Sequence, residues 1–364
     1  MKEWFNYINR YKKRPLKRKI LFINQPLFKD GKEEVDTFDY FCQLFASLNI
    51  HLDSLKKFDV VTKVVSFDKA IEEQNLLIKY CVENPYEYDY LIVNLFSRKE
   101  SIDNIKELMN TEGAPKLILI DKGFRDEACC KDDEIWKMKK TGNQMFKNSF
   151  DSFDKVMPSY FQVSWEKGGE MAALQIFDYA KHCFKKYDYN EYDIIVLHGN
   201  DCFERGLKFK QKIETLNSGF EKKLTVQELE SDFSNNGGYD EINNYLNTKH
   251  NGDRPLIGVF CSNDEMALGV RRAFIDFELD SKLPVRPKIV GFDGIKDVTL
   301  HIDHQMEKYI LNTVNVKVNE MTKNVYLFLN RYNTNPKADW VENYIEADCK
   351  LYKPIHQQRN RYDK

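Results

Sequence analysis

The sequence predicts an α/β protein of two Rossmann-like lobes, each built on a parallel sheet. Short apolar runs alternate with segments of helical periodicity along most of the 364 residues, which is typical of a parallel sheet covered by helices. This alternation occurs twice, on either side of a loop-rich stretch at 121–159. Several of the apolar runs end in Asn or Asp, and the carboxyl ends of strands are where open α/β sheets bind ligands.

The first half of the chain predicts four strands and three helices. The run at 19–24 is apolar from Ile20 to Ile23 and ends in polar residues before Pro26, as expected of a buried parallel strand. The helix that begins at 69 ends near 82, because Asn84-Pro85 cannot continue it. We expect strands at 19–24, 60–67, 88–95 and 116–120, and helices at 37–48, 69–82 and 101–109.

The second half repeats the pattern after the excursion at 121–159. A helix begins after Gln162 and runs to about Phe184. We expect strands at 193–197, 223–229, 256–261, 288–292 and 310–314, and helices at 203–217, 239–246, 265–276 and 319–330.

Composition indicates a soluble, folded domain without a nucleic-acid partner. Hydrophobic residues make up 42% of the chain, charged residues 31%, and the net charge is −2, so no strong basic field is expected. The chain contains no run of eighteen apolar residues, so no transmembrane helix is expected. The basic segment 1–18 lacks the apolar core of a secretory signal; it suits a surface helix packed on the body, or one that anchors at a membrane surface.

Metal, nucleotide and catalytic signatures are weak. The eight cysteines form no CxxC pair, which favours free thiols and a reducing compartment. His301 and His304 have helical spacing but no third ligand in evidence, and Gly168-Gly169 lies outside any phosphate-binding glycine pattern. We therefore expect no cofactor, no metal and no enzymatic activity.

Two motifs carry a family resemblance. The segment 259–274 is an apolar strand followed by Ser-Asn-Asp-Glu-Met-Ala-Leu-Gly, and 288–294 is Lys-Ile-Val-Gly-Phe-Asp-Gly. Together they resemble type I periplasmic binding proteins of the ribose-binding and autoinducer-2-binding branch, and the lactose-repressor-type sensor domains that share this periplasmic-binding-protein-like I fold. The resemblance extends from about 19 to 345. It implies two lobes joined by a three-crossing hinge, with crossings near 162–165, near 313–317 and near the C-terminus.

The resemblance also implies domain boundaries. The N-terminal lobe would comprise 19–163 plus 316–345, and the C-terminal lobe 164–315. The segment 1–18 would be an extension, and 346–364 a tail.

The resemblance assigns a sugar-binding site at the strand ends of both lobes. A sugar hydroxyl needs both a donor and an acceptor: Arg205 donates, Asp121 and Asp293 accept, and Asn263 does both. Phe233 would cover the C–H face of a sugar ring. The expected ligand-binding residues are Gln25, Asp121, Lys122, Trp165, Arg205, Phe233, Asn263 and Asp293.

Alternatives remain for several of these residues. Asn263 precedes a helix and suits an N-cap, Arg205 suits an ion pair, and Trp165 suits a core position. Ribose binders carry Asn where Trp165 stands, and Val316 replaces the long polar residue of the third crossing strand. The autoinducer-2 receptors use an Arg at that place, so Val316 argues against a borate ester, unless Lys122 or Arg125 supplies the cation.

We expect a non-enzymatic protein that binds a sugar or polyol between its lobes, with a membrane transporter or sensor kinase as the downstream reader and no nucleic acid as partner. The resemblance implies a periplasmic location, although no signal peptide precedes the first strand. The alternative is a cytoplasmic ligand-sensing domain of the same fold without a DNA-binding head. A third hypothesis is an enzyme with a similar two-lobed α/β fold, although no set of catalytic residues stands out in the sequence.

Overall fold

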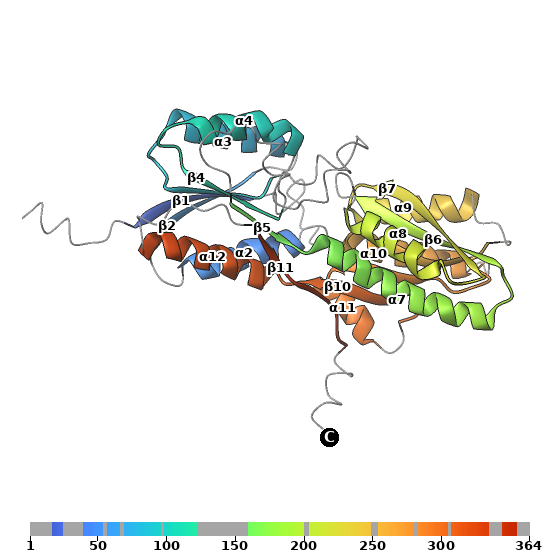
Figure 1. Cartoon of the computed structure of the whole chain (residues 1–364). Helices are drawn as coiled ribbons and strands as arrows, with labels where there is room; N and C mark the ends of the chain where they lie inside the picture. The colour runs from blue at the N-terminus through green and yellow to red at the C-terminus, as the bar shows by residue number, and fades with distance from the viewer. Residues whose placement is uncertain are drawn as a thin grey trace, which may run out of the picture.

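The structure is a computed structural model of the whole chain. It describes residues 17–24, 39–53, 57–65, 69–95, 98–121, 159–199, 204–248, 254–279, 283–304, 307–334 and 344–354. The described residues form two α/β lobes side by side, each around a six-stranded sheet (Figure 1). The predicted fold class is confirmed.

The first sheet has the strand order β11-β5-β4-β3-β1-β2, and every pairing in it is parallel. Its strands are β1 (Arg18–Asn24), β2 (Phe58–Val64), β3 (Tyr90–Val93), β4 (Lys116–Ile120), β5 (Ser159–Val163) and β11 (Tyr344–Ala347). Helices α2 (Asp39–Asp53) and α12 (Val318–Thr334) cover one face, and α3 (Ala70–Glu83) and α4 (Arg98–Asn110) cover the other (Figure 1).

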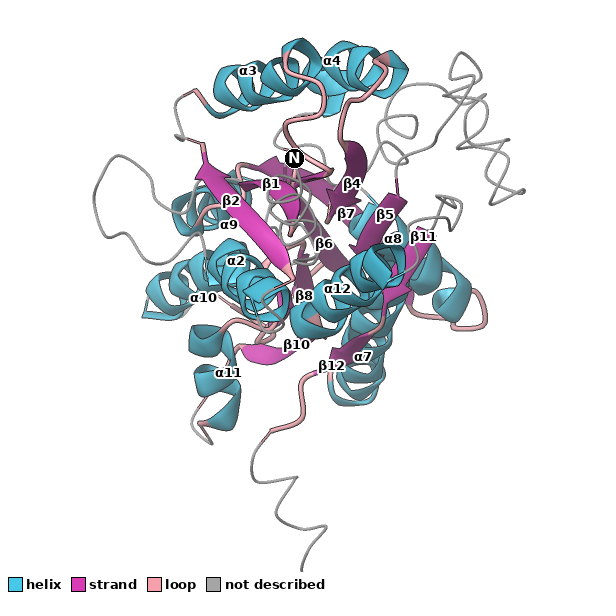
Figure 2. Ribbon diagram, turned by 90° about the vertical axis from the view of Figure 1, so that its left-hand side faces the viewer, coloured by secondary structure: helices cyan, strands magenta, loops and turns pink. Residues whose placement is uncertain are grey.

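The second sheet has the order β12-β10-β9-β8-β6-β7, with β12 antiparallel at its edge. Its strands are β6 (Glu191–Gly199), β7 (Lys223–Ser231), β8 (Leu256–Cys261), β9 (Lys288–Asp293), β10 (Ile310–Val316) and β12 (Cys349–Leu351). Helices α7 (Trp165–Lys186) and α8 (Glu204–Asn217) pack on one face. Helices α9 (Asn235–Thr248), α10 (Asp264–Leu279) and α11 (Lys296–Asp303) pack on the other, as the turned view shows (Figure 2).

Alternating side chains divide each sheet between two helical layers. In β1, Ile20 and Phe22 are buried with α2 and α12, whereas Leu21 and Ile23 are buried with α3 and α4. Strands β3 and β8 are buried along their whole length. Central parallel strands lie between two apolar faces, which is why these segments are uninterrupted apolar runs in the sequence.

The chain crosses between the sheets three times. It leaves β5 for α7 at Ser164, leaves β10 for α12 at Lys317, and passes from β11 to β12 at Asp348. The first and third crossings are joined directly, because the backbone N–H of Ser164 donates to the carbonyl of Ala347 at 2.9 Å. These adjacent connections form the three-crossing hinge.

Several elements differ from the sequence prediction. Helix α11 and strands β5, β11 and β12 were not predicted as separate elements. Helix α9 begins at Asn235, four residues earlier than expected, although Asn and Gly disfavour helix interiors. A Cβ at Gly238 would lie 2.5 Å from the carbonyl oxygen of Met266, so close packing of α9 on α10 accounts for the glycine. The 121–159 excursion lies almost wholly outside the described residues.

None of the helices in the described ranges is long and apolar enough to cross a membrane.

Candidate functional site

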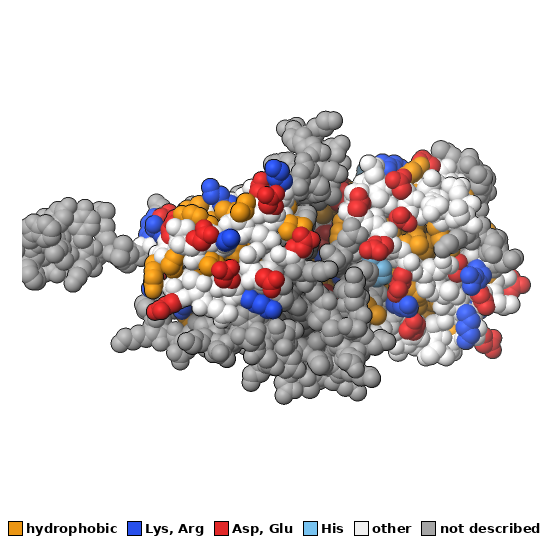
Figure 3. Space-filling model, turned by 90° about the horizontal axis from the view of Figure 1, so that it is seen from above, with side chains coloured by type: hydrophobic (Ala, Val, Ile, Leu, Met, Phe, Trp, Pro, Cys, Tyr) orange, Lys and Arg blue, Asp and Glu red, His pale blue; other side chains and the backbone are white. Residues whose placement is uncertain are grey.

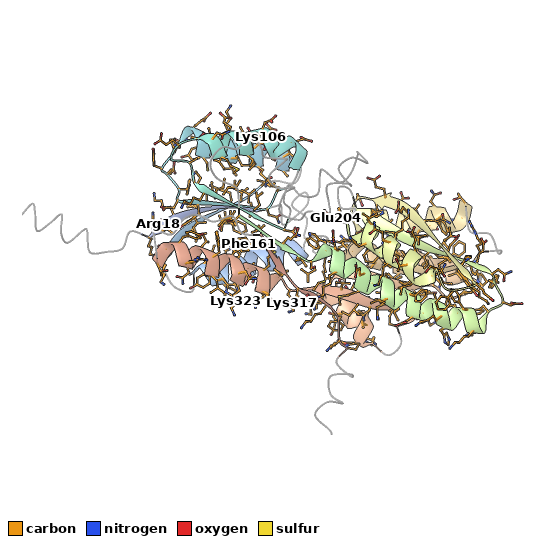
Figure 4. The ribbon with its side chains drawn as sticks, in the orientation of Figure 1. Arg18, Lys106, Phe161, Glu204, Lys317 and Lys323 are labelled. Atoms are coloured by element: carbon orange, nitrogen blue, oxygen red, sulfur yellow. The ribbon has the colours of Figure 1, made fainter. Side chains whose placement is uncertain are left out.

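Most of the predicted site residues of the second lobe lie at the carboxyl edge of its sheet. Phe233 follows β7, Asn263 follows β8, and Asp293 ends β9. Arg205 lies in the first turn of α8, and Trp165 begins α7. Glu204, the residue before Arg205, lies at the end of the second lobe that is turned toward the first (Figure 4).

Arg205 packs against two aromatic rings. Its Cζ atom lies 3.9 Å from the centre of the Trp165 ring and 4.1 Å from the centre of the Phe292 ring. The two rings are themselves 5.7 Å apart, tilted by 46°. Arg205 is only 7% exposed and Trp165 only 5%. Cation–π attraction is stronger in such a desolvated setting, at about 2 kcal/mol. Trp165 therefore contacts the predicted ligand-binding arginine directly.

Polar groups fix the same guanidinium from the sheet edge. Nη1 of Arg205 donates to the backbone carbonyl of Ser262 and lies 3.6 Å from Oδ1 of Asp293. The two charged side chains are 8% and 11% exposed. Opposite charges this well removed from water stabilise each other, and removing either one leaves a costly buried charge.

Asn263 caps a helix and also clamps a neighbouring loop. Its Oδ1 accepts a hydrogen bond from the N–H of Met266 at 2.9 Å, which is N-cap geometry for α10. Its Nδ2 donates to the carbonyl of Phe233 at 2.8 Å. A side-chain amide has two N–H donors and two acceptor lone pairs, so the capping interpretation and a ligand contact are compatible. The contact with a ligand stays a prediction.

Asp264 is an organising residue that the sequence interpretation missed. Its Oδ2 accepts from the N–H groups of Gly294 and Ile295 at 2.7 and 2.9 Å, and its Oδ1 accepts from the Thr313 hydroxyl at 2.7 Å. Complete burial raises the pKa of Asp264 to about 7, although these hydrogen bonds act in the opposite direction. Asp264 thus ties the loop after Asp293 to the crossing strand β10. Its place beside Asn263 in the Asn-Asp pair was the available signal.

Backbone strain gathers at the predicted site. Among the described residues, four that are not glycine have positive φ, and three of them are predicted ligand-binding residues: Asp121 at 64°, Phe233 at 66° and Asp293 at 115°. Such conformations cost about 1–3 kcal/mol each and concentrate at functional sites. The strain is an indication of function that the sequence did not provide.

Asp121 occupies the corresponding edge of the first sheet. It follows β4, is 3% exposed, and its N–H donates to the carbonyl of Phe161 at 2.8 Å. Phe161 itself lies within the core of the first lobe (Figure 4). Gln25 and Lys122 lie outside the described residues, so the first lobe contributes one described candidate.

The crossing strand β10 places Asn315, not Val316, beside the site. Val316 is 5% exposed and belongs to the hydrophobic core. Asn315 pairs in register with Asp293, and its Cγ would lie 2.9 Å from a Cβ added at Gly294. Asn315 is therefore the polar side chain that this strand offers at the edge of the second sheet.

His198 is a second buried group near Arg205. It lies in β6, is 4% exposed, and burial lowers its pKa, which keeps the ring neutral at pH 7. A Cβ at Gly206 would lie 2.1 Å from its Cε1, so the first turn of α8 rests directly on the imidazole.

The described residues contain no group of three or more His, Cys, Asp or Glu side chains placed to hold a metal. Nδ1 of His301 instead lies 3.6 Å from a Glu307 oxygen. On the face seen in Figure 3, acidic and basic side chains are interspersed over both lobes.

Solved structures with the same architecture are numerous, although a scan against protein-family models and a search of curated proteins each find no match. A solute-binding protein from Actinobacillus succinogenes with bound D-allose is 16% identical, with a TM-score of 0.65 over 94% of this chain and 100% of that one. A solute-binding protein from Bacillus halodurans with bound myo-inositol is 15% identical, with a TM-score of 0.65 over 97% and 100%. A LacI-family transcriptional regulator from Burkholderia phymatum is 18% identical, with a TM-score of 0.59 over 92% and 98%.

These similarities establish the type I periplasmic-binding-protein fold, which sugar-binding proteins and LacI-type regulators share. The fold neighbours are binding proteins and repressors. At these identities the likeness concerns the fold alone, and the ligand has to be argued from the site.

Proposed function

We propose that this chain is a non-enzymatic binding protein that captures a sugar or sugar-like polyol between its two lobes. The observation that carries the proposal is the joint placement of Arg205, Asp293, Asn263 and Phe233 at one sheet edge, in a network that includes buried charges and strained backbone. Asp121 occupies the matching edge of the first lobe.

The chemistry of these groups suits vicinal hydroxyls. A carboxylate accepts from a hydroxyl and a guanidinium donates to its oxygen, and both bonds are strengthened by charge. Phe233 supplies an apolar surface for ring carbons. Analogues without the hydroxyls would leave buried polar groups unpaired and would be rejected strongly.

A neutral ligand fits the charge balance better than an anion does. Arg205 is already opposed by Asp293 at 3.6 Å, and the crossing strand β10 offers the neutral Asn315 beside Asp293, whereas an autoinducer-2 receptor has a second arginine on this strand. The charge balance at the site therefore favours a neutral sugar, as bound by the ribose-binding branch, over the borate ester bound by the autoinducer-2 branch.

Lobe closure would couple binding to its readout. A ligand that contacts both lobes favours the closed state, since only that state makes both sets of contacts. The three crossings at Ser164, Lys317 and Asp348 are the connections about which the lobes would move. We propose a membrane transporter or a sensor kinase as the reader of the closed state.

A thermal-shift screen against pentoses, hexoses, polyols and autoinducer-2 with and without borate tests the proposal. A ligand at one hundred times its dissociation constant stabilises the folded state by roughly 2.7 kcal/mol. Arg205→Lys should abolish the shift, because an ammonium group cannot reproduce the planar fork. Lys208→Gln, a half-buried residue of the same helix that pairs with Glu166, is the control and should retain it. A shift that survives Arg205→Lys contradicts the site assignment.

A ligand-sensing domain of a cytoplasmic regulator is the second candidate. It is supported by the fold shared with LacI-type regulators and by three free, buried cysteines at 81, 183 and 261. Cell fractionation of the native gene product distinguishes the two: we expect it with periplasmic markers, and recovery with cytoplasmic markers would favour the sensor.

A further inference from the structure

A cavity lies beside the last turns of α7, at the end of that helix that is turned away from the first lobe (Figure 1). The cavity has a volume of about 510 Å³. Its walls come from the last turns of α7, from the segment before β9 with the first residue of that strand, and from the residue before β10. The lining residues are Tyr179, His182, Lys186, Tyr187, Leu283, Pro284, Arg286, Lys288 and Tyr309.

The lining is cationic. Lys186, Arg286 and Lys288 carry three positive charges into one cavity, His182 adds an imidazole, and no lining residue is acidic. The chain as a whole has a net charge of −2, so this concentration of positive charge is a local feature. Like charges held together in a concave site repel each other, and an anion bound between them relieves that repulsion.

The framework of the cavity is fixed by hydrogen bonds. The Tyr179 hydroxyl donates to the carbonyl of Arg286 at 2.6 Å, and Nζ of Lys288 donates to the carbonyl of Lys308 at 2.5 Å. An ammonium group has three N–H donors. The bond to the Lys308 carbonyl therefore orients Lys288 and leaves two of its N–H groups able to donate to a ligand. Burial lowers the pKa of Lys288, and the adjacent Arg286 charge lowers it further.

Two described acidic residues of the surrounding elements, Glu307 and Asp178, have partners of their own. Glu307 accepts from Arg271 at 2.9 Å and from the N–H groups of Tyr309 and Ile310 at 2.8 and 3.1 Å. Asp178 pairs with Lys181 at 2.6 Å. The carboxyl end of α7 disfavours an anion by roughly 0.3–1 kcal/mol, which three cations outweigh.

We propose that this cavity is a binding site for a small phosphate-bearing anion, separate from the sugar site. Arg286 supplies a planar fork that matches two phosphate oxygens, Lys186 and Lys288 supply point charges, and the tyrosines border the rest of the ligand. The site lies at the amino end of β9, which begins with Lys288, whereas Asp293 ends the same strand at the sugar site.

Calorimetric titration with pyrophosphate at fixed ionic strength tests the proposal. We expect saturable binding of one pyrophosphate per chain. Arg286→Gln and Lys288→Gln should each weaken it by about tenfold, the equivalent of 1.4 kcal/mol. Lys185→Gln is the matched control: Lys185 and Lys186 both lie in the last turn of α7, but only Lys186 lines this cavity.

Three outcomes would overturn the assignment. The first is heat no greater than that of dilution. The second is equal weakening by Lys185→Gln and Arg286→Gln, which would indicate diffuse surface charge. The third is tighter binding of succinate than of pyrophosphate, which would exclude phosphate as the preferred group. Arg286 is exposed, so Arg286→Gln should fold normally and keeps the test valid if Lys288→Gln unfolds.

Discussion

The guanidinium of Arg205 lies 3.9 Å from the centre of the Trp165 ring, which makes Trp165 a neighbour of the cation and not an isolated platform for a sugar. The same guanidinium is held by Asp293 and by the Ser262 carbonyl. Trp165 therefore helps to orient Arg205. Substitutions of Trp165 can separate its effect on ligand affinity from its effect on stability.

Trp165→Phe should weaken ligand binding at a modest cost in stability. Phenylalanine retains an aromatic face but gives a weaker cation–π contact than tryptophan, so Arg205 becomes less well fixed. We expect affinity for the sugar found in the screen to fall by about three- to tenfold, with less than about 1.5 kcal/mol lost from the free energy of unfolding. Calorimetry and urea denaturation measure the two quantities. Unchanged affinity would show that Trp165 serves only the core.

Trp165→Ala provides the contrast. Truncating a buried aromatic typically costs 3–5 kcal/mol, and Trp165 is only 5% exposed. We therefore expect a large fall in the urea midpoint together with loss of binding, whereas Trp165→Phe should lower both quantities only modestly.

Asn263→Ala should cost more than an ordinary helix cap. Loss of the cap on Met266 is worth about 1 kcal/mol, and the bond to the Phe233 carbonyl is lost at the same time. We expect a destabilisation of about 1.5–3 kcal/mol by chemical denaturation. Asn263→Asp keeps the cap but lacks the amide donor, so its loss of stability should be smaller than that of Asn263→Ala by the contribution of the cap alone. If Asn263→Asp were as stable as the original chain, the hydrogen bond to the Phe233 carbonyl would contribute nothing.

Gly169→Ala should separate α7 from α8 and disturb Arg205. A Cβ at Gly169 would lie 2.1 Å from the backbone oxygen of Arg205, and a helix backbone cannot yield as a flexible side chain does. We expect a destabilisation of about 1–3 kcal/mol by overpacking. Gly219→Ala is the control, because no atom lies within 4 Å of its added Cβ. Equal denaturation midpoints for the two variants would contradict the close approach.

The sequence predicted the architecture because each central strand is an apolar run between helical segments. Burial of β3 and β8 on both faces is what produces such runs. Helix α9 could not be bounded correctly, since its Asn-Gly start is stabilised by packing on α10 and not by local propensity.

The candidate site was predicted as residue types at strand ends but not as a network. Nothing local to Arg205 indicates that Trp165 and Phe292 lie against it, because the three residues belong to different elements. Asp264 was missed for a similar reason: its partners Gly294, Ile295 and Thr313 are 30 to 49 positions away. Likewise, Val316 was taken as the residue facing the site, and only the pairing of β10 with β9 identifies Asn315 in that place.

Asp264→Asn should change how stability depends on pH. Burial raises the pKa of Asp264 to about 7, above the value of about 3.9 in an unfolded chain. Between these values the folded protein binds more protons than the unfolded one, so this residue makes the free energy of unfolding rise as pH falls from 7 toward 4. Asparagine does not titrate, so the variant lacks that gain.

The stability gap between the original chain and Asp264→Asn should therefore widen by roughly 1–3 kcal/mol from pH 8 to pH 5. Urea denaturation of both proteins at each pH measures the gap. Thr313→Val is the control, because it removes one hydrogen bond to the carboxylate but leaves it able to titrate. That bond favours the charged form, so in Thr313→Val the rise in stability should persist and extend to higher pH. A gap that narrows toward pH 5 would mean that the hydrogen bonds from Gly294, Ile295 and Thr313 outweigh burial and keep Asp264 ionised.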